Sequence, residues 1–304
     1  MSVPVCADCF KGTLRGDVIP TGHEDVVHGL PTYIAAPEPG IKPLGTVVLI
    51  TDAFGWSLRN TRALADSYAR RVPCNVYVPD FMDGKAIPLS FITAFESKPN
   101  PDTPWILHTL VKTWNIIKAV PVFLLWLYRT RPSVGWPRVR SFISAVRTTP
   151  TENGELPKVG VAGFCWGGLY AVGLTNTQNP KNWVSLGERK TPLIDCAFTA
   201  HPSMLKLPRH IHEVELPLSL ANGENDSFMK RAQMEETMRI LEEKNKSTRE
   251  VEGDNIPDKY EVVVYPGAKH GFAFRGDRED PLQKERGDQS EDQAVRWFSR
   301  WFSI

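Results

Sequence analysis

The sequence predicts an α/β protein with a mostly parallel central sheet and helices on both of its faces. Short apolar runs rich in β-branched residues recur along the chain, and helix-like stretches separate them. The run Thr46–Ile50 (TVVLI) has the continuous hydrophobicity of a strand that is buried on both faces. Because strands that alternate with helices pair in parallel through right-handed crossovers, we expect a single sheet built in this way.

The first expected element is an antiparallel hairpin over residues 17–36, where loosely alternating residues are interrupted by glycine and proline turn signals. Further strands are expected at Thr46–Ile50, Asn75–Val78, Lys158–Ala162, Leu193–Ala200, Leu216–Ala221 and Tyr260–Tyr265. Helices are expected at Ser57–Arg71, Leu169–Leu174, Ser227–Lys244 and Ser290–Phe302. Together they form one α/β domain that spans residues 1–304.

The stretch between Asp80 and Lys158 breaks this alternation, because it contains no clear strand. It holds four of the nine tryptophans, Trp105, Trp114, Trp126 and Trp136, and six prolines lie between residues 99 and 137. Each proline removes an amide donor and disfavours helix just before it, so we expect several short helices. We interpret residues 99–149 as a helical cap-like insertion that contributes to substrate choice.

Composition excludes several classes of protein. The chain has 36 Lys and Arg against 35 Asp and Glu, so it lacks the basic surplus that nucleic-acid binding needs. The N-terminus lacks the basic and apolar regions of a signal peptide, which predicts a cytoplasmic protein with reduced thiols. Cys6 and Cys9 form a lone C-x-x-C without further ligands in pattern, so we expect no metal.

The most apolar segment is Ile116–Tyr128, with 13 residues. A membrane span needs about 20 apolar residues, so we expect a buried or site-capping helix and no membrane contact. Binding at a membrane interface stays open as the alternative, because basic residues flank or interrupt the segment. These are Lys112, Lys118, Arg129 and Arg131.

The sharpest motif is the run V-G-V-A-G-F-C-W-G-G, which ends at Gly168. An apolar strand leads into G-x-C-x-G and then into a helix, which is the pattern of a nucleophile elbow with Cys165 as the nucleophile. The small flanking residues allow close backbone approach, and the helix N-terminus favours a thiolate. The backbone amide of Trp166 is then placed to stabilise an oxyanion. The alternative is a buried cysteine that happens to lie between glycines.

An elbow of this kind predicts an acid and then a histidine further along the chain. Asp226 follows the expected strand Leu216–Ala221 and is the predicted acid, with Glu224 as the competitor. His270 follows the strand Tyr260–Tyr265. Both loops leave the carboxyl ends of strands, where open α/β sheets collect their sites. We expect Cys165 to attack a carbonyl, His270 to handle the proton and Asp226 to orient His270.

Two other loops are expected at the same edge of the sheet. In the loop after Thr46–Ile50 the backbone amide of Ala53 is the second oxyanion donor. Asp52 and Phe54 of this loop are expected to contact substrate, although a surface or helix-capping role for Asp52 stays open. His201 follows the strand Leu193–Ala200 and either lines the pocket or is structural.

These residues together resemble the dienelactone hydrolase family of α/β-hydrolases, in the branch common in fungi. The resemblance runs from about Asp17 to the C-terminus and rests on G-F-C-W-G-G, N-G-E-N-D, K-H-G-F, D-A-F-G, P-D-F and A-H-P-S. It implies an α/β-hydrolase fold with helices on both faces and a Cys165–Asp226–His270 triad. The family's early loop usually carries a glutamate that contacts the resting thiol, and the shorter Asp52 stands there in this chain.

The resemblance also bears on substrate. Family members that cleave dienelactone hold its carboxylate with arginines, one of them shortly after P-D-L. No arginine follows Pro79 in P-D-F-M-D-G-K, although Arg275 could supply the second one. The aromatic insertion, with Trp126 expected at the pocket, favours a bulkier and more apolar acyl or lactone substrate.

The sequence therefore predicts a cysteine hydrolase that acts on a small-molecule ester or lactone without an organic cofactor. One alternative is lactonisation or acyl transfer in secondary metabolism, where an internal hydroxyl replaces water at the same triad. Another is a non-catalytic small-molecule binder, since fold does not fix function. We expect a monomer or a homodimer.

Overall fold

The computed structural model describes residues 19–88, 105–151, 153–253, 256–274 and 280–304. Eight strands form one sheet in the order β1-β2-β4-β3-β5-β8-β9-β10. The first two pairs, β1 with β2 and β2 with β4, are antiparallel, and all later pairs are parallel. The strands are β1 (His23–Val27), β2 (Leu30–Ala35), β3 (Thr46–Ile50), β4 (Asn75–Pro79), β5 (Val159–Phe164), β8 (Cys196–Ala200), β9 (Leu218–Asn225) and β10 (Tyr260–Lys269).

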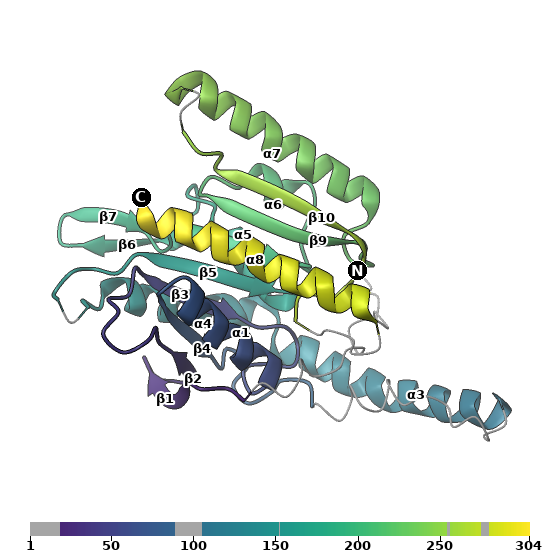
Figure 1. The fold of residues 1–304 in the computed structure, drawn as a ribbon. Coiled ribbons are helices and arrows are strands. Elements are labelled where there is room, and N and C mark those ends of the chain that lie inside the picture. The colour runs from purple at the N-terminus through teal and green to yellow at the C-terminus, as the bar shows by residue number, and fades with distance from the viewer. Residues whose placement is uncertain (1–18, 89–104, 152, 254–255, 275–279) are drawn as a thin grey trace.

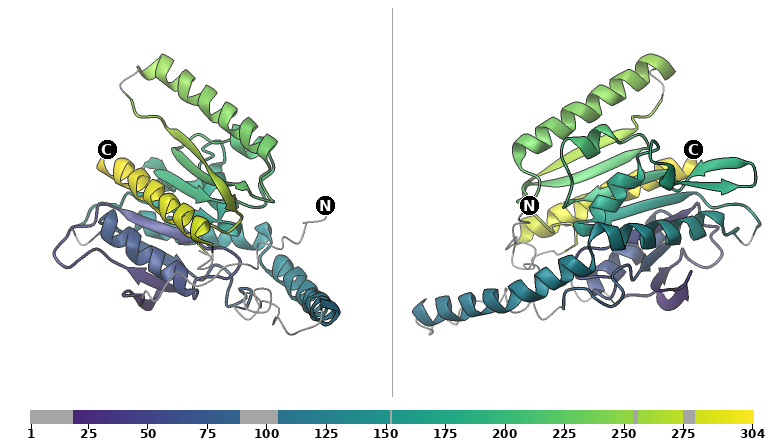
Figure 2. Two further views of the ribbon diagram at one scale, coloured as in Figure 1. Left: turned by 45° about the vertical axis from the view of Figure 1, so that its right-hand side comes forward. Right: turned by 180° about the vertical axis from the view of Figure 1, so that it is seen from behind.

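Helices cover both faces of this sheet (Figure 1). On one face α1 and α8 pack against each other and against the strands. The rear view in Figure 2 shows α4 and α5 on the other face, where Trp136 of α4 packs edge-on against Tyr170 of α5. The helices are α1 (Arg59–Arg71), α3 (Trp105–Arg129), α4 (Pro132–Thr148), α5 (Trp166–Leu174), α6 (Arg209–His212), α7 (Arg231–Glu252) and α8 (Pro281–Ser303).

The predicted fold class is confirmed. Every expected strand is present within a few residues, because continuous apolar runs mark strands that are buried on both faces. The last four residues of β3, from Val47 to Ile50, are completely buried. The sequence did not predict a small separate hairpin, β6 (Trp183–Leu186) with β7 (Arg189–Pro192), whose residues are mostly exposed or half-buried and lack an apolar signal.

The expectation that prolines cut the inserted segment into short helices is wrong. The helix α3 runs unbroken for 25 residues through Pro121, and α4 runs through Pro137. Both prolines are exposed, so the carbonyl groups that they leave without an amide donor can turn to water. Proline therefore marks solvent-facing positions here and ends neither helix.

The two helices of the insertion lie very differently. α4 packs on the sheet, where Phe142 meets the rings of Tyr77 and Phe81 edge-on at 5.6 to 6.4 Å. By contrast, α3 extends away from the body of the molecule in every view (Figures 1 and 2). None of the described helices is both long enough and apolar enough to cross a membrane. A cap function for residues 99–149 stays a prediction, and residues 99–104 lie outside the described part of the chain.

Candidate active site

Cys165 occupies a strained turn between β5 and α5. Its backbone has φ 50° and ψ −108°, a conformation that non-glycine residues rarely adopt. Two glycines make the turn possible. A Cβ on Gly163 would lie 2.5 Å from the carbonyl oxygen of Gly167, and one on Gly167 would lie 2.0 Å from that of Ile50. The structure thus contains the tight strand-to-helix turn that the G-x-C-x-G spacing predicts.

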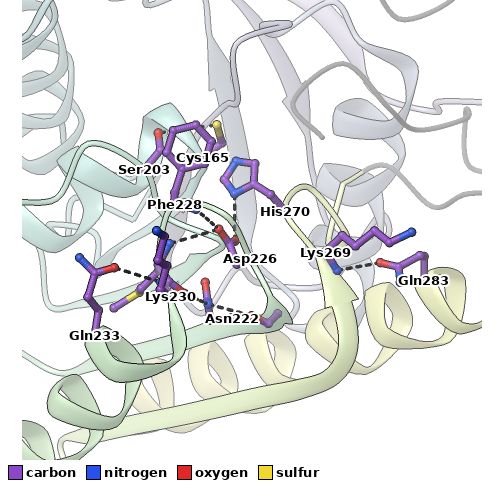
Figure 3. A network of polar contacts seen from close by, with 12 residues as sticks. Cys165, Ser203, Asn222, Asp226, Phe228, Lys230, Gln233, Lys269, His270 and Gln283 are labelled. Carbon is purple, nitrogen blue, oxygen red and sulfur yellow. Dashed lines mark hydrogen bonds and ion pairs between the residues drawn. The ribbon is translucent and has the colours of Figure 1, made fainter. Parts of the chain in front are cut away.

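The loop after β8 holds the elbow from the other side. The amide of Cys165 donates to the carbonyl of Ala200, and the amide of Ser203 donates to the carbonyl of Cys165 at 2.9 Å. The hydroxyl of Ser203 lies 3.7 Å from the sulfur of Cys165 (Figure 3). Sequence reasoning did not assign a role to Ser203. The signal available was its place in A-H-P-S, directly after a strand that ends at the same edge of the sheet.

Asp226 lies one residue beyond β9 and faces His270, which lies one residue beyond β10. The carboxylate oxygen Oδ2 of Asp226 is 2.9 Å from Nδ1 of His270 (Figure 3). The other oxygen, Oδ1, accepts hydrogen bonds from the amides of Phe228 and Met229 at 2.7 and 3.3 Å. The carboxylate is therefore fixed by its own loop before it contacts the imidazole.

The competitor, Glu224, points elsewhere. Its carboxylate accepts a hydrogen bond from the amide of Gly267 at 2.9 Å, and the residue is exposed. Because Asp226 is buried and carries the contact to His270, the geometry favours Asp226 over Glu224 as the partner of the imidazole.

His270 is an unusually basic histidine. Burial lowers its pKa, but the charges of Asp226 and Cys165 and the hydrogen bonds with them raise the pKa to about 10. The second ring nitrogen, Nε2, is buried and points toward the sulfur of Cys165 in Figure 3. At neutral pH this arrangement favours an imidazolium beside a thiolate.

The two expected oxyanion donors lie on adjoining loops. The amide of Gly167 donates to the carbonyl of Thr51 at 3.1 Å, which ties the elbow to the loop after β3. Among the described residues the amides of Ala53 and Trp166 donate to no other group. The indole nitrogen of Trp166 donates to the carbonyl of Thr130, just beyond α3. Two unused amides beside a nucleophile can stabilise a developing oxyanion.

Asp52 and Phe54 are both almost completely buried in this loop. The carboxylate of Asp52 accepts a hydrogen bond from the amide of Phe54 at 3.0 Å, so it helps to shape the turn. This hydrogen bond gives the carboxylate of Asp52 a structural role in the loop. Contact of either side chain with substrate stays a prediction.

Aromatic rings surround the imidazole of His270. His201 is completely buried, and its ring centre lies 5.0 Å from that of His270. The ring of Phe228 lies 4.6 Å from His270 (Figure 3). Phe228 had no signal in the sequence, since it is placed there by the loop that Asp226 organises. The histidine is thus buried between aromatic rings.

The remaining expected substrate contacts are less clearly placed. The indole of Trp126 donates to the sulfur of Met82 at 3.4 Å and stacks on Phe123, so it belongs to the core at the base of α3. Arg275 lies outside the described residues, as do Cys6 and Cys9. In the described part of the chain no three His, Cys, Asp or Glu side chains gather as metal ligands.

The sheet order, the elbow and the loops at one sheet edge define an α/β-hydrolase fold. A putative dienelactone hydrolase from Klebsiella pneumoniae shares this fold, with a TM-score of 0.57 and 16% identity over 92% of this chain and 99% of its own. The sequence profile of the dienelactone hydrolase family matches residues 30–302, and the chain belongs to this family of hydrolases.

Curated fungal proteins are similar over nearly their whole length. The chain is 22% identical to "Hydrolase pyvD" of Aspergillus violaceofuscus, across 99% of this chain and 98% of that protein. It is 25% identical to "Hydrolase tropI" of Talaromyces stipitatus, again across 99% and 98%. The resemblance inferred from the motifs is therefore confirmed at the level of the family.

Proposed function

We propose that the protein hydrolyses a carboxylic ester or lactone through an acyl-Cys165 intermediate. One observation carries the proposal above all others. The sulfur of Cys165, on its strained turn, faces an imidazole that is hydrogen-bonded to a buried, loop-fixed carboxylate. Nucleophile, base and orienting acid in this order are the parts that acyl transfer requires.

In the acylation step the thiolate of Cys165 attacks the carbonyl carbon of the substrate and a C–S bond forms. The carbonyl oxygen becomes an oxyanion, which accepts hydrogen bonds from the amides of Ala53 and Trp166. When the C–O bond breaks, the imidazolium of His270 gives its proton to the departing alkoxide. The pKa of about 10 keeps that proton available at neutral pH.

In the deacylation step the neutral imidazole of His270 takes a proton from water, and the resulting hydroxide attacks the thioester. The C–S bond breaks, the carboxylic acid leaves and the thiolate is restored beside the imidazolium. Asp226 holds the ring so that Nε2 faces the reacting atoms in both steps.

The surroundings support an apolar acyl or lactone substrate. Phe228 and His201 pack around His270, and no arginine is present between Pro79 and Lys85 to bind a substrate carboxylate. Lys85 of this segment and Arg138 of α4, which lies against it, are both paired with Asp83, at 3.0 and 3.4 Å. At this segment an anionic dienelactone would therefore meet cations that Asp83 already neutralises in part.

The proposal is tested with p-nitrophenyl acetate and p-nitrophenyl esters of longer acyl chains. We expect turnover that disappears in Cys165→Ala, and a mass increase of one acyl group on the Cys165 peptide when the reaction is quenched early. A folded protein that neither turns over these esters nor becomes acylated would overturn it. Product analysis with a hydroxy ester separates hydrolysis from ring closure.

A further inference from the structure

The helix α3 exposes an apolar stripe for which the proposed active site has no use. Each of nine large apolar side chains on it is between 47% and 64% exposed, and only four others among the described residues are exposed to this degree. The nine that form the stripe are Ile106, Leu107, Leu110, Val111, Trp114, Ile117, Leu124, Leu125 and Tyr128. Proteins that stay free in water rarely expose a continuous apolar surface of this kind.

The stripe has a defined orientation. At about 100° per residue, its nine positions fall within an arc of about 140° on the helix. Among the described residues of α3, the buried ones lie on the opposite side of the helix, and they are Ala119, Phe123 and Trp126. The helix is thus packed against the body near its C-terminal end, on the side away from the stripe, and the rest of it projects from the body (Figure 2).

Charge around the stripe is strongly one-sided. The sequence of α3, Trp105–Arg129, contains no Asp or Glu but has three basic residues, and Arg131 follows shortly after it. Lys118 and Arg129 lie at one edge of the stripe and are exposed. The ammonium of Lys118 lies 5.1 Å from the ring of Trp114, and the guanidinium of Arg131 lies 4.3 Å from the ring of Tyr128.

We infer that α3 is a docking surface for an anionic phospholipid bilayer, on which the helix lies in the plane of the interface. Apolar side chains, interfacial Trp and Tyr and a basic edge without acids are the chemistry that such an interface recognises. The stripe enters the boundary of the acyl chains, and Lys118, Arg129 and Arg131 meet the headgroup phosphates.

A second copy of the chain is a poorer occupant of this surface. A twofold interface pairs the same patch with itself, so the basic residues of one α3 would face those of the other with no acid between them.

The surface lies close to the candidate active site, although the inference does not depend on the proposed chemistry. Thr130 follows α3 directly, and its carbonyl accepts the indole hydrogen bond of Trp166, the neighbour of Cys165. The C-terminal end of α3 is thus hydrogen-bonded to the turn that carries Cys165, so a bilayer bound along α3 would lie near the candidate active site. Apolar esters that partition into lipid would be concentrated there.

The test is co-sedimentation of the full-length protein with sucrose-loaded vesicles of phosphatidylcholine, alone or mixed with phosphatidylserine. We expect binding to the mixed vesicles that weakens as salt is raised, and little binding to phosphatidylcholine alone. The stripe variant Trp114→Glu/Ile117→Glu should lose binding at least about tenfold. Reversal of two charges in Lys118→Glu/Arg129→Glu should weaken it about thirtyfold.

The matched control is Met238→Glu/Val251→Glu, which places two acids at exposed apolar positions of α7 and should bind like the parent. Circular dichroism checks that each variant is folded, and esterase activity is measured separately. The inference is overturned if the parent ignores anionic vesicles, or if the stripe variant binds as well as the parent. It is also overturned if light scattering shows that the parent is a dimer and the stripe variant a monomer, because a second copy then covers the stripe. Binding that appears only after residues 1–18 are removed would overturn it as well, because that segment would then be the occupant.

Discussion

Oδ2 of Asp226 lies 2.9 Å from Nδ1 of His270, and both side chains are completely shielded from solvent. The pair joins two loops that are 44 residues apart in the chain but leave neighbouring parallel strands, β9 and β10. Asp226 receives two amide hydrogen bonds from its own loop, so its position does not depend on His270. A carboxylate fixed in this way can set the tautomer and the orientation of the imidazole.

The first prediction concerns this carboxylate. Asp226→Asn should lower kcat for ester hydrolysis by a factor of about 10² to 10⁴, because the amide supports the wrong tautomer of the histidine. The measurement is the initial rate with p-nitrophenyl acetate at neutral pH. The matched control is Glu224→Gln in the same loop, which should keep parental activity because Glu224 contacts Gly267 and not the imidazole. Equal losses in the two variants would contradict the assignment.

The second prediction concerns the proton on His270. NMR of protein with labelled histidine should show a pKa of about 10 in the parent. In Cys165→Ala the pKa should fall, since the charge and the hydrogen bond of Cys165 both raise it. Asp226→Asn should lower it as well, and for the same two reasons. The resonance of His210 is an internal control, because burial lowers its pKa and neither substitution is among its neighbours.

The third prediction follows from the sign of this shift. A protonated His270 favours the thiolate, so iodoacetamide should label Cys165 faster in the parent than in His270→Gln at pH 7. The difference should close as the pH rises, because the thiol of the variant then loses its own proton. Peptide mass spectrometry assigns the label to Cys165. The buried thiols of Cys74 and Cys196 should stay unlabelled, because burial raises their pKa.

The fourth prediction concerns the elbow itself. Gly167→Ala should destabilise the protein by about 3 kcal/mol, because the new Cβ would meet the backbone of Ile50 and not a flexible side chain. Gly187→Ala, in the turn between β6 and β7, is the control. It has a positive φ but open space around it, so it should cost only about 1 kcal/mol of backbone strain. Urea unfolding measures both, and similar losses would argue against a tight elbow.

The order of the candidate site residues could be predicted from sequence, because each follows a buried strand whose apolar run is easily recognised. Cys165, Asp226 and His270 all leave the carboxyl ends of such strands, and the parallel sheet brings these ends to one edge. Strand order alone favours Asp226 but leaves Glu224 open as the competitor. The choice between them depends on a turn in which Asp226 bonds to two amides of its own loop, and composition does not encode that geometry.

The helix α3 shows a different limit of sequence reasoning. Proline signals suggested broken helices, but Pro121 sits on the exposed side, where its missing hydrogen bond costs little. The apolar run Ile116–Tyr128 suggested burial, yet Ile117, Leu124 and Leu125 are about half exposed. Hydrophobicity tells which residues avoid water. It does not tell whether the protein's own core or another surface covers them.

The last prediction concerns Ser203, which sequence reasoning overlooked. Its hydroxyl lies 3.7 Å from the sulfur of Cys165 and its amide donates to the carbonyl of Cys165, so the loop after β8 positions it beside the nucleophile. A hydroxyl that donates to a thiolate stabilises it by roughly 1 to 2 kcal/mol. Ser203→Ala should therefore slow the alkylation of Cys165 at pH 7 about tenfold while leaving the free energy of unfolding nearly unchanged. Ser203→Thr keeps the hydroxyl and should restore most of the rate, whereas a rate in Ser203→Ala equal to that of the parent would show that the hydroxyl does not act on the sulfur.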